Sequence, residues 1–415
     1  MTSSTELPRS ARWFVFSSLA FTILSLSYSL LGRLMGCGLP YSYPYYLSVG
    51  TFFTDFNELA LRFQHLGTPA FFAPNQYFMY PPAMVLPYAA IARWLPDPFH
   101  TFILVFLIAF VLLTVCFYLV LRRYFAPGAA MLLVASTAVT CYPFLLLIQR
   151  ENMEVVSWTL ITVGLWWFYR ERFIWASICI GLATALKIYP LIFFGLFLPR
   201  RLYRELVVGI ASCTAVTLLG LRVISPNIGF AYAWDKTQLG AFGRYYTTSM
   251  LGLGYDHSFF ALVKCATLPW LPDLNRVLSI YTWTVVIGCL VLFFSHVWKL
   301  PLVNQIVALS VLSVAAPPAS HEYTLLTLYV SLAVLCVLSV NATGLAPYFL
   351  LYAAILTPQS YVIVHGARYV GPIHAVLLLA LLGLSLWWPV ETSSGCIAST
   401  IPGTSRRRDG IMTAG

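Results

Sequence analysis

One carboxylate stands directly after the first apolar stretch of the chain, in a polar segment that covers residues 51–82. Asp55 is flanked by Phe52, Phe53 and Phe56, whose rings would hold it near a membrane surface. A carboxylate in this position can accept a proton from a hydroxyl group as that hydroxyl attacks a substrate. We therefore interpret Asp55 as a candidate general base, and a solvated loop carboxylate is the alternative.

Three further polar side chains follow in the same segment. Glu58 and Arg62 have the i,i+4 spacing that places two side chains on one face of a helix, so we expect them to pair. Tyr80 precedes Pro81-Pro82, and proline suits the first turn of a helix. We interpret the two prolines as a helix start and Tyr80 as a residue that could line a site.

A lysine interrupts the apolar sequence between residues 173 and 199. A charged side chain at membrane depth is costly, and it therefore suggests a function. At the apex of a short helical hairpin, Lys187 would lie near the outer interface, where the phosphate of a lipid lies. The alternative is that Lys187 extends its ammonium group to lipid headgroups without binding a substrate.

A second polar turn joins two apolar stretches at Gln149, Arg150, Glu151 and Asn152. Its hydrogen-bond donors could hold a sugar or a phosphate, which makes Gln149 and Asn152 candidate binding residues. A polar cap between two helices explains the same turn equally well.

The second half of the chain adds four candidates. His321-Glu322 follows a pair of prolines, and a histidine there could donate to a phosphate or orient a carboxylate, or simply cap a helix. His257 lies in the segment 256–258, which could bind a ligand or cap a helix. Arg368 could contact a phosphate or a lipid headgroup.

The composition identifies the class of protein. Of 415 residues 60% are hydrophobic and only 9% are charged, with a mean hydropathy of +0.81. Apolar runs of about 20 residues cross a bilayer as helices, so we predict an all-α polytopic membrane protein. The net charge of +10 is typical of positively charged cytoplasmic loops and does not indicate a nucleic-acid partner. The nine cysteines form no Cys-x-x-Cys pair, and we expect neither a disulfide framework nor a metal site.

The apolar runs and the basic turns predict a topology of about twelve transmembrane helices with both termini inside. Residues 1–390 form one transmembrane domain, and the Ser/Thr/Gly-rich residues 391–415 form a disordered cytoplasmic tail. The loops 32–100 and 225–277 lie outside, and the short apolar segment 83–95 lies on the membrane rather than across it. All the candidate residues then share the outer side. The predicted spans are 12–31, 101–121, 127–147, 153–169, 173–186, 190–199, 205–224, 278–298, 302–317, 323–340, 344–363 and 369–389.

The chain resembles membrane glycosyltransferases of the GT-C superfamily, and among them the mannosyltransferases of glycosyltransferase family 87. The resemblance covers roughly residues 12–390. It departs from the family pattern at Ile148-Gln149-Arg150, where a glycine is usual, and at Asp256-His257, where Asn-Gln is common. The residues that carry it are Thr54-Asp55-Phe56, Tyr80-Pro81-Pro82, Gln149 and Asn152, the run GLATALKIYPLIF that contains Lys187, Asp256-His257-Ser258, and Pro318 to His321.

This resemblance implies a GT-C fold with juxtamembrane helices in the first outer loop and an extracytoplasmic active site. The expected reaction is an inverting transfer of a hexose, mannose, from a polyprenyl-phosphate donor to a lipid or glycan acceptor, in the plasma membrane of a bacterium. No metal or other cofactor is expected. The catalytic candidates are Asp55 and His321, and the donor-binding candidates are Lys187, Gln149, Asn152, Tyr80, His257, Glu322 and Arg368.

Two other classes of function remain open. A transporter or flippase would place paired ionisable groups near the middle of the membrane and would often show internal repeats. The candidate residues of this chain lie on one side and without evident partners, and we find no repeat. A non-catalytic membrane scaffold would tolerate the loss of Asp55.

Overall fold

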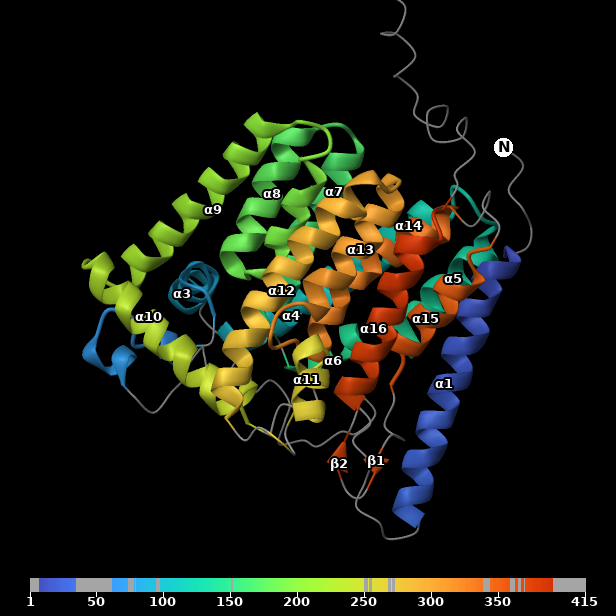
Figure 1. Ribbon diagram of the computed structural model, residues 1–415, viewed down its shortest axis with the longest axis horizontal. Coiled ribbons are helices and arrows are strands. Elements are labelled where there is room, and N and C mark those ends of the chain that lie inside the picture. The colour runs from blue at the N-terminus through green and yellow to red at the C-terminus, as the bar shows by residue number, and fades with distance from the viewer. Residues whose placement is uncertain are drawn as a thin grey trace, which may run out of the picture.

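The computed structural model describes a helical chain whose elements are drawn in Figure 1. It describes residues 7–34, 62–73, 78, 80–94, 98–150, 152–249, 253, 256–267, 270, 273–338, 344–358, 363–364, 367–368 and 370–390.

Helices form nearly all of the regular structure in these residues. The first half contains α1 (Arg9–Leu34), η2 (Pro69–Phe72), η3 (Pro82–Met84), α3 (Val85–Trp94), α4 (Pro98–Leu121), α5 (Pro127–Thr140), α6 (Tyr142–Arg150), α7 (Glu154–Tyr169), α8 (Phe173–Leu186), η4 (Tyr189–Leu196) and α9 (Tyr203–Ile224). The second half contains α10 (Ile228–Phe242), the π-helical turn η5 (Gly243–Thr247), α11 (Phe259–Thr267), α12 (Leu274–Ser295), η7 (Val297–Lys299), α13 (Leu302–Ala315), η8 (Glu322–Leu326), α14 (Thr327–Leu338), α15 (Ala346–Leu356) and α16 (Val370–Trp387). A hairpin of two-residue strands, β1 (Ile363–Val364) and β2 (Ala367–Arg368), precedes α16.

The predicted class, an all-α polytopic membrane protein, is confirmed. Three helical stretches combine the length and hydropathy needed to cross a bilayer: Arg9–Tyr28, Tyr203–Ile224 and Leu274–Lys299. Most of the other predicted spans form apolar helices of 10–17 residues, shorter than the sequence suggests. Large apolar side chains such as Trp283 and Ile287 on α12 are exposed on the outside of the bundle, as expected of a surface in contact with lipid.

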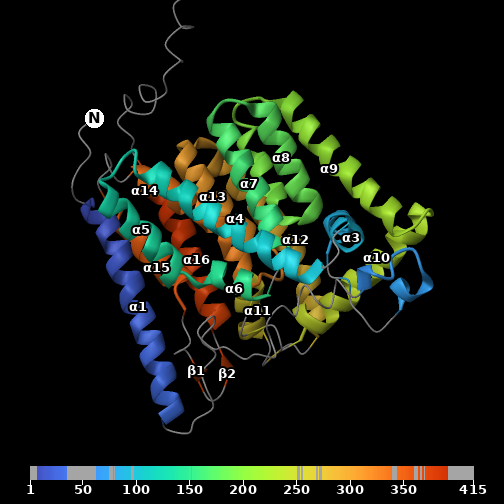
Figure 2. The same ribbon diagram turned by 180° about the vertical axis from the view of Figure 1, so that it is seen from behind.

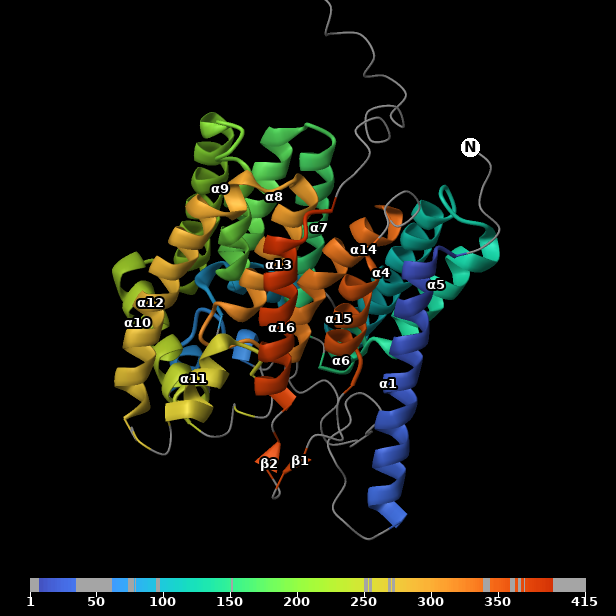
Figure 3. The same ribbon diagram turned by 45° about the vertical axis from the view of Figure 1, so that its right-hand side comes forward.

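The helices form one broad bundle. The helix α8 packs between α7 and α9 at one end of the molecule, and α1 packs on α15 and α5 at the other. Between them, α13 packs against α14, α16 and η4. Seen from behind, α4 and α5 cover the bundle (Figure 2), and α16 stands in front of α13 in the rotated view (Figure 3).

The predicted hinge at Lys187 is confirmed, although the segment after it differs from the prediction. The helix α8 ends at Leu186, and Lys187 has an extended backbone with φ −146° and ψ 136°. We predicted a separate span over 190–199, but the chain forms the eight-residue 3-10 helix η4 instead. Pro190 lies in its first turn, where its missing N–H costs no hydrogen bond.

The predicted span 127–147 is wrong as a single helix. It is broken at Cys141, whose extended backbone separates α5 from α6. Pro143 explains the break, because proline has no N–H to donate to the preceding turn and its ring would clash with the carbonyl of the residue four positions earlier. The predicted span 344–363 is likewise too long, since α15 stops at Leu356, just before Thr357-Pro358.

The second outer loop, predicted over 225–277, is largely helical. It contains α10 and α11, and Asn227 caps α10 by accepting a hydrogen bond from the Phe230 amide. In the first of the two predicted outer loops, η3 and α3 form the short helix expected around 83–95, and Pro82 begins it as predicted. A 10-residue helix is too short to cross a bilayer, which fits a position on its surface.

An aromatic core lies beside these loop helices and consists of Phe63, Phe71, Phe78, Tyr80 and Tyr88. Its rings are buried, and Phe63 stacks on Tyr88 with a centroid distance of 5.0 Å. This packing fixes the position of Tyr80, one of the predicted site residues.

Arg62 belongs to the edge of the aromatic core. Its Nε donates to the Phe71 carbonyl at 3.0 Å, and its guanidinium lies 5.1 Å from the Trp234 ring of α10. Burial lowers its pKa to about 10, so the side chain stays charged at neutral pH. Its expected partner, Glu58, lies outside the described residues.

A close helix contact holds η3 against α9. A Cβ placed on Gly220 of α9 would lie 2.4 Å from the Pro82 carbonyl oxygen. Only glycine fits at this distance, so Gly220 allows the segment that carries Tyr80 to pack closely against α9.

We predict that Gly220→Ala lowers the thermal unfolding temperature of the detergent-purified protein. Overpacking of this kind costs about 1–3 kcal/mol. The matched control is Gly288→Ala in α12, where an added Cβ meets nothing within 4 Å. That control should be neutral or up to about 1 kcal/mol more stable, because alanine favours helix. Equal unfolding temperatures for the two variants would contradict the close contact.

Candidate active site

A polar cluster lies where α6 ends, α7 begins, α8 ends and η8 begins. It brings together four residues that the sequence predicted for the site: Tyr80, Asn152, Lys187 and His321. Each stands at or just outside the end of a helix rather than inside one.

Lys187 forms an ion pair with Glu154, the first residue of α7. Its Nζ lies 3.1 Å from Glu154 Oε2, the Lys187 side chain is 15% exposed, and the Glu154 side chain is fully buried. Tyr189 donates its hydroxyl to the other oxygen of the same carboxylate. A buried carboxylate requires such partners, because an unpaired charge in an apolar environment is strongly unfavourable.

Glu154 was not among the predicted site residues, and the expectation that the polar residues lack partners is wrong. A signal was present in the sequence. Glu154 begins one apolar helix and Lys187 ends the next, and the start of one helix lies beside the end of the next when the two pack antiparallel.

Tyr80 and Asn152 complete the surroundings of Lys187. Asn152 Nδ2 donates to the Tyr80 hydroxyl at 3.0 Å, and Asn152 Oδ1 accepts from the Glu154 amide at 3.0 Å. Lys187 Nζ lies 4.3 Å from the Tyr80 ring centroid and 5.8 Å from that of Tyr323. Cation–π contacts of this kind stabilise an ammonium group. Asn152 therefore satisfies the first amide of α7 and also belongs to the cluster.

His321 joins the cluster through two tyrosines, Tyr246 and Tyr323. Its Nδ1 is 3.2 Å from the Tyr246 hydroxyl, and its ring stacks on Tyr323 with a centroid distance of 5.1 Å. Burial, together with the charges of Lys187 and Arg150, lowers the pKa of His321 to about 3. The imidazole is thus neutral at pH 7 and acts through hydrogen bonds rather than through charge.

The charges around His321 show the electrostatic character of the cluster. Lys187 and Arg150 both disfavour a proton on His321, so two positive charges act on this part of the cluster. Such a site suits an anion such as a phosphate. Glu322 is buried at the first position of η8, next to His321 in the chain.

His257 supports the segment that carries His321. Asp256 Oδ1 accepts hydrogen bonds from the amides of Ser258 at 3.0 Å and Ser320 at 2.9 Å. The His257 amide donates to the Ser320 carbonyl at 2.9 Å. Ser258 caps α11, because its Oγ accepts from the Ala261 amide at 3.3 Å, so the cap was the correct alternative for this segment. Asp256 ties the segment to Ser320 and so fixes the chain beside His321.

The His257 ring is paired with a histidine that the sequence did not indicate. Its Nδ1 lies 2.9 Å from Nδ1 of His374 on α16, and both rings are fully buried. Burial lowers the pKa of His257 well below its usual value, and the neighbouring His374 and His321 lower it further. Two neutral rings can share this hydrogen bond, because one nitrogen donates and the other accepts.

For three of the predicted site residues, the structure does not describe a side chain. Asp55 lies outside the described residues. Gln149 lies in the last turn of α6 and Arg368 in β2, but the structure describes no side chain for either. Within the described part of the chain, no three His, Cys, Asp or Glu side chains gather as metal ligands.

With this geometry established, the comparison with known families is decisive. The family model of glycosyltransferase family 87 matches residues 78–318, more than half of the chain. The chain belongs to glycosyltransferase family 87. It is therefore a membrane glycosyltransferase. No curated protein and no solved structure matches the chain.

The matched range of this family 87 glycosyltransferase includes most of the cluster. Tyr80, Asn152, Lys187 and His257 lie within it, whereas His321 lies just beyond its end. The geometry adds His321 to the same cluster through its contacts with Tyr246 and Tyr323.

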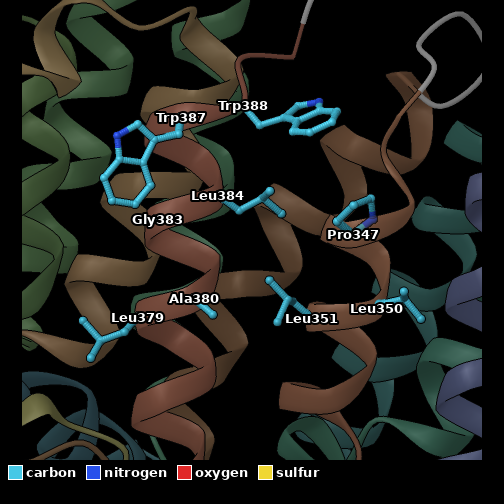
Figure 4. A pocket seen from close by; sticks show the side chains of 9 residues that line it. All are labelled: Pro347, Leu350, Leu351, Leu379, Ala380, Gly383, Leu384, Trp387 and Trp388. Atoms are coloured by element: carbon cyan, nitrogen blue, oxygen red, sulfur yellow. The ribbon is translucent and has the colours of Figure 1, made fainter.

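An apolar groove lies elsewhere on the glycosyltransferase, between α15 and α16. It has a volume of about 610 Å³, and Figure 4 shows Leu351 and Leu384 lining it below Trp388. Its lining suits hydrocarbon rather than a sugar. The polar cluster, not this groove, is the candidate active site.

We predict that the ion pair stabilises the fold only as a pair. Glu154→Gln and Lys187→Met should each lower the free energy of unfolding by up to about 3–5 kcal/mol, because each leaves a buried group without its partner. The double variant should recover much of this loss. Lys236→Met removes an exposed lysine of α10 and should change stability by less than about 0.5 kcal/mol. Additive losses in the double variant would show that the two side chains are not coupled.

Proposed function

We propose that this glycosyltransferase transfers mannose from a polyprenyl-phosphate donor to a lipid or glycan acceptor on the extracytoplasmic face of a bacterial plasma membrane. The observation that carries this proposal is the position of Lys187. An ammonium group is held at the end of an apolar helix, between Glu154 and the Tyr80 ring and near His321. A phosphate attached to a membrane lipid would reach this depth.

The cluster could hold the phosphate by hydrogen bonds and charge. The Lys187 side chain is partly exposed, so its ammonium group could contact a phosphate. Arg150 adds a second positive charge. A neutral His321 that accepts from Tyr246 at Nδ1 would carry its proton on Nε2 and could donate it to a phosphate oxygen. These groups would stabilise the negative charge that grows on the leaving phosphate.

The basic residues at one end of the same helices support the proposed face of the membrane. The helix α7 begins at the cluster and ends beside Arg170, and α8 begins after Arg172 and ends at Lys187. The turn between them lies at the upper end of Figure 1, and α1 also begins at its upper end. Basic turns favour the cytoplasm, which would place the cluster outside.

Asp55 is the proposed general base. It precedes Arg62 by seven residues, and Arg62 packs against Trp234 and Phe71 beside the buried Tyr80. Seven residues span at most about 25 Å, so Asp55 can reach the cluster. It would remove the proton from the acceptor hydroxyl as that oxygen attacks the sugar carbon and the phosphate leaves, which inverts that carbon.

We predict that Asp55→Asn keeps donor binding but lowers turnover by about 10²–10⁴-fold, because the amide cannot accept the proton. The measurement is donor affinity and turnover on one purified preparation. The matched control is Asp273→Asn, which changes an exposed carboxylate that caps α12 and leaves a side chain that also caps helices. Near-normal turnover of Asp55→Asn would refute the role of Asp55 and leave the family assignment intact.

A second prediction concerns the face of the membrane. Single cysteines at Lys236 in α10 and at Arg201 after η4 both replace exposed residues. In a background without the nine native cysteines, a membrane-impermeant maleimide added to intact cells should label position 236 alone. Position 201 should react only after the membrane is opened. The reverse pattern would place the cluster on the cytoplasmic side.

A further inference from the structure

One face of α10 is buried although the helix lies in the second outer loop. Ala231, Asp235 and Gln238 are buried, whereas Tyr232 and Lys236 are exposed. The buried positions recur every three to four residues, as expected for one side of a helix. This side therefore faces the protein, and it carries a carboxylate.

The buried face meets the candidate active site at one end through Phe78. Gln238 Oε1 accepts from the Phe78 amide at 3.2 Å, and the Trp234 ring stacks on Phe78 with a centroid distance of 5.9 Å. Phe78 in turn contacts Tyr80, whose ring lies under Lys187.

The same face meets the site again through η5, which continues α10. Phe242 stacks on Tyr246 with a centroid distance of 5.5 Å and an angle of 6° between the rings. The Tyr246 hydroxyl lies 3.2 Å from His321 Nδ1. Asp235 therefore lies on a helix that contacts both sides of the cluster, the Tyr80 side and the His321 side.

The Asp235 carboxylate is buried with an unsatisfied oxygen. Asp235 as a residue is only 4% exposed, and its Oδ1 has no hydrogen-bond partner within the described part of the chain. Two cations lie on or against α10. The Lys236 side chain is exposed, and the Arg62 side chain donates to the Phe71 carbonyl and lies over the Trp234 ring. Burial raises the pKa of Asp235 to about 7, so the carboxylate carries its charge only at an energetic cost. Proteins rarely retain such a group unless something binds it.

We infer that Asp235 binds hydroxyl groups of the hexose carried by the lipid-phosphate donor. An ionised carboxylate accepts hydrogen bonds and donates none. It therefore pairs with hydroxyl groups and repels the phosphate. The phosphate would lie at Lys187 and the hexose, attached directly to it, toward α10. Aromatic rings with a few polar groups are typical of ligand sites, and Trp234 and Phe78 supply them here. This inference rests on the proposed function, because it assumes a sugar-bearing lipid donor.

Binding of two lipids separates sugar recognition from phosphate recognition. We would titrate the full-length purified enzyme with polyprenyl-phosphate mannose and with sugar-free polyprenyl phosphate. Asp235→Asn should weaken binding of the first lipid about 10- to 100-fold, the equivalent of one hydrogen bond to a charged group, and leave binding of the second unchanged. Asp273→Asn, at the exposed cap of α12, should change neither.

The unfolding temperature of Asp235→Asn is a second measurement. If the carboxylate had a purely structural role, the substitution would change this temperature in the opposite direction. The folded-state pKa of Asp235, about 7, exceeds the ordinary value of 3.8, so the folded protein binds the extra proton between these values. Wild-type stability therefore falls as pH rises through this window, and Asp235→Asn escapes that loss. The variant should unfold at a higher temperature than wild type at pH 8, with a smaller difference at pH 5.5.

The outcomes are distinct. Unchanged affinity of Asp235→Asn for the mannose lipid, or an equal loss for both lipids, would overturn the role of Asp235 while leaving the proposed function standing. A lower unfolding temperature at pH 8 would also overturn it, because the carboxylate would then stabilise the fold. If wild type binds neither lipid, the proposed function fails, and the inference fails with it.

Discussion

An ammonium group at the end of an apolar helix needs a partner, and the Lys187–Glu154 ion pair meets this need. The rest of the site depends on it. The pair requires the end of α8 to lie beside the start of α7, which their antiparallel packing provides. Asn152 then links the start of α7 to Tyr80, and the Tyr80 ring lies 4.3 Å from the same ammonium group. A bound phosphate would have to share Lys187 with Glu154.

The pair also changes how the rival functions compare. Unpartnered, one-sided polar residues seemed to argue against a transporter, but Lys187 has an acidic partner, so that argument is weak. Family membership decides in favour of sugar transfer instead. The neutral state of His321 fits this chemistry, because a neutral imidazole can donate one hydrogen bond to a phosphate without adding a second buried charge.

Local sequence signals predicted part of this structure. The rest could not be predicted, because it depends on contacts between residues that are far apart in the chain. The hinge at Lys187 was predictable because a lysine and a proline follow an apolar run, and the break at Cys141 could have been predicted from Pro143. The pairing of His257 with His374 could not be predicted from a single sequence, because the two residues are 117 positions apart. The same holds for the contact between Tyr246 and His321, because only the folded bundle brings η5 to η8.

The most direct test of the account follows the sugar and its carrier together. Membranes that contain the protein are incubated with polyprenyl-phosphate mannose labelled in the mannose, and both lipid products are separated. We expect label to move from the polyprenyl lipid into a second molecule, with release of an equal amount of sugar-free polyprenyl phosphate, only when the protein is present. Intact labelled donor that merely changes sides of the membrane would contradict it and would indicate a flippase.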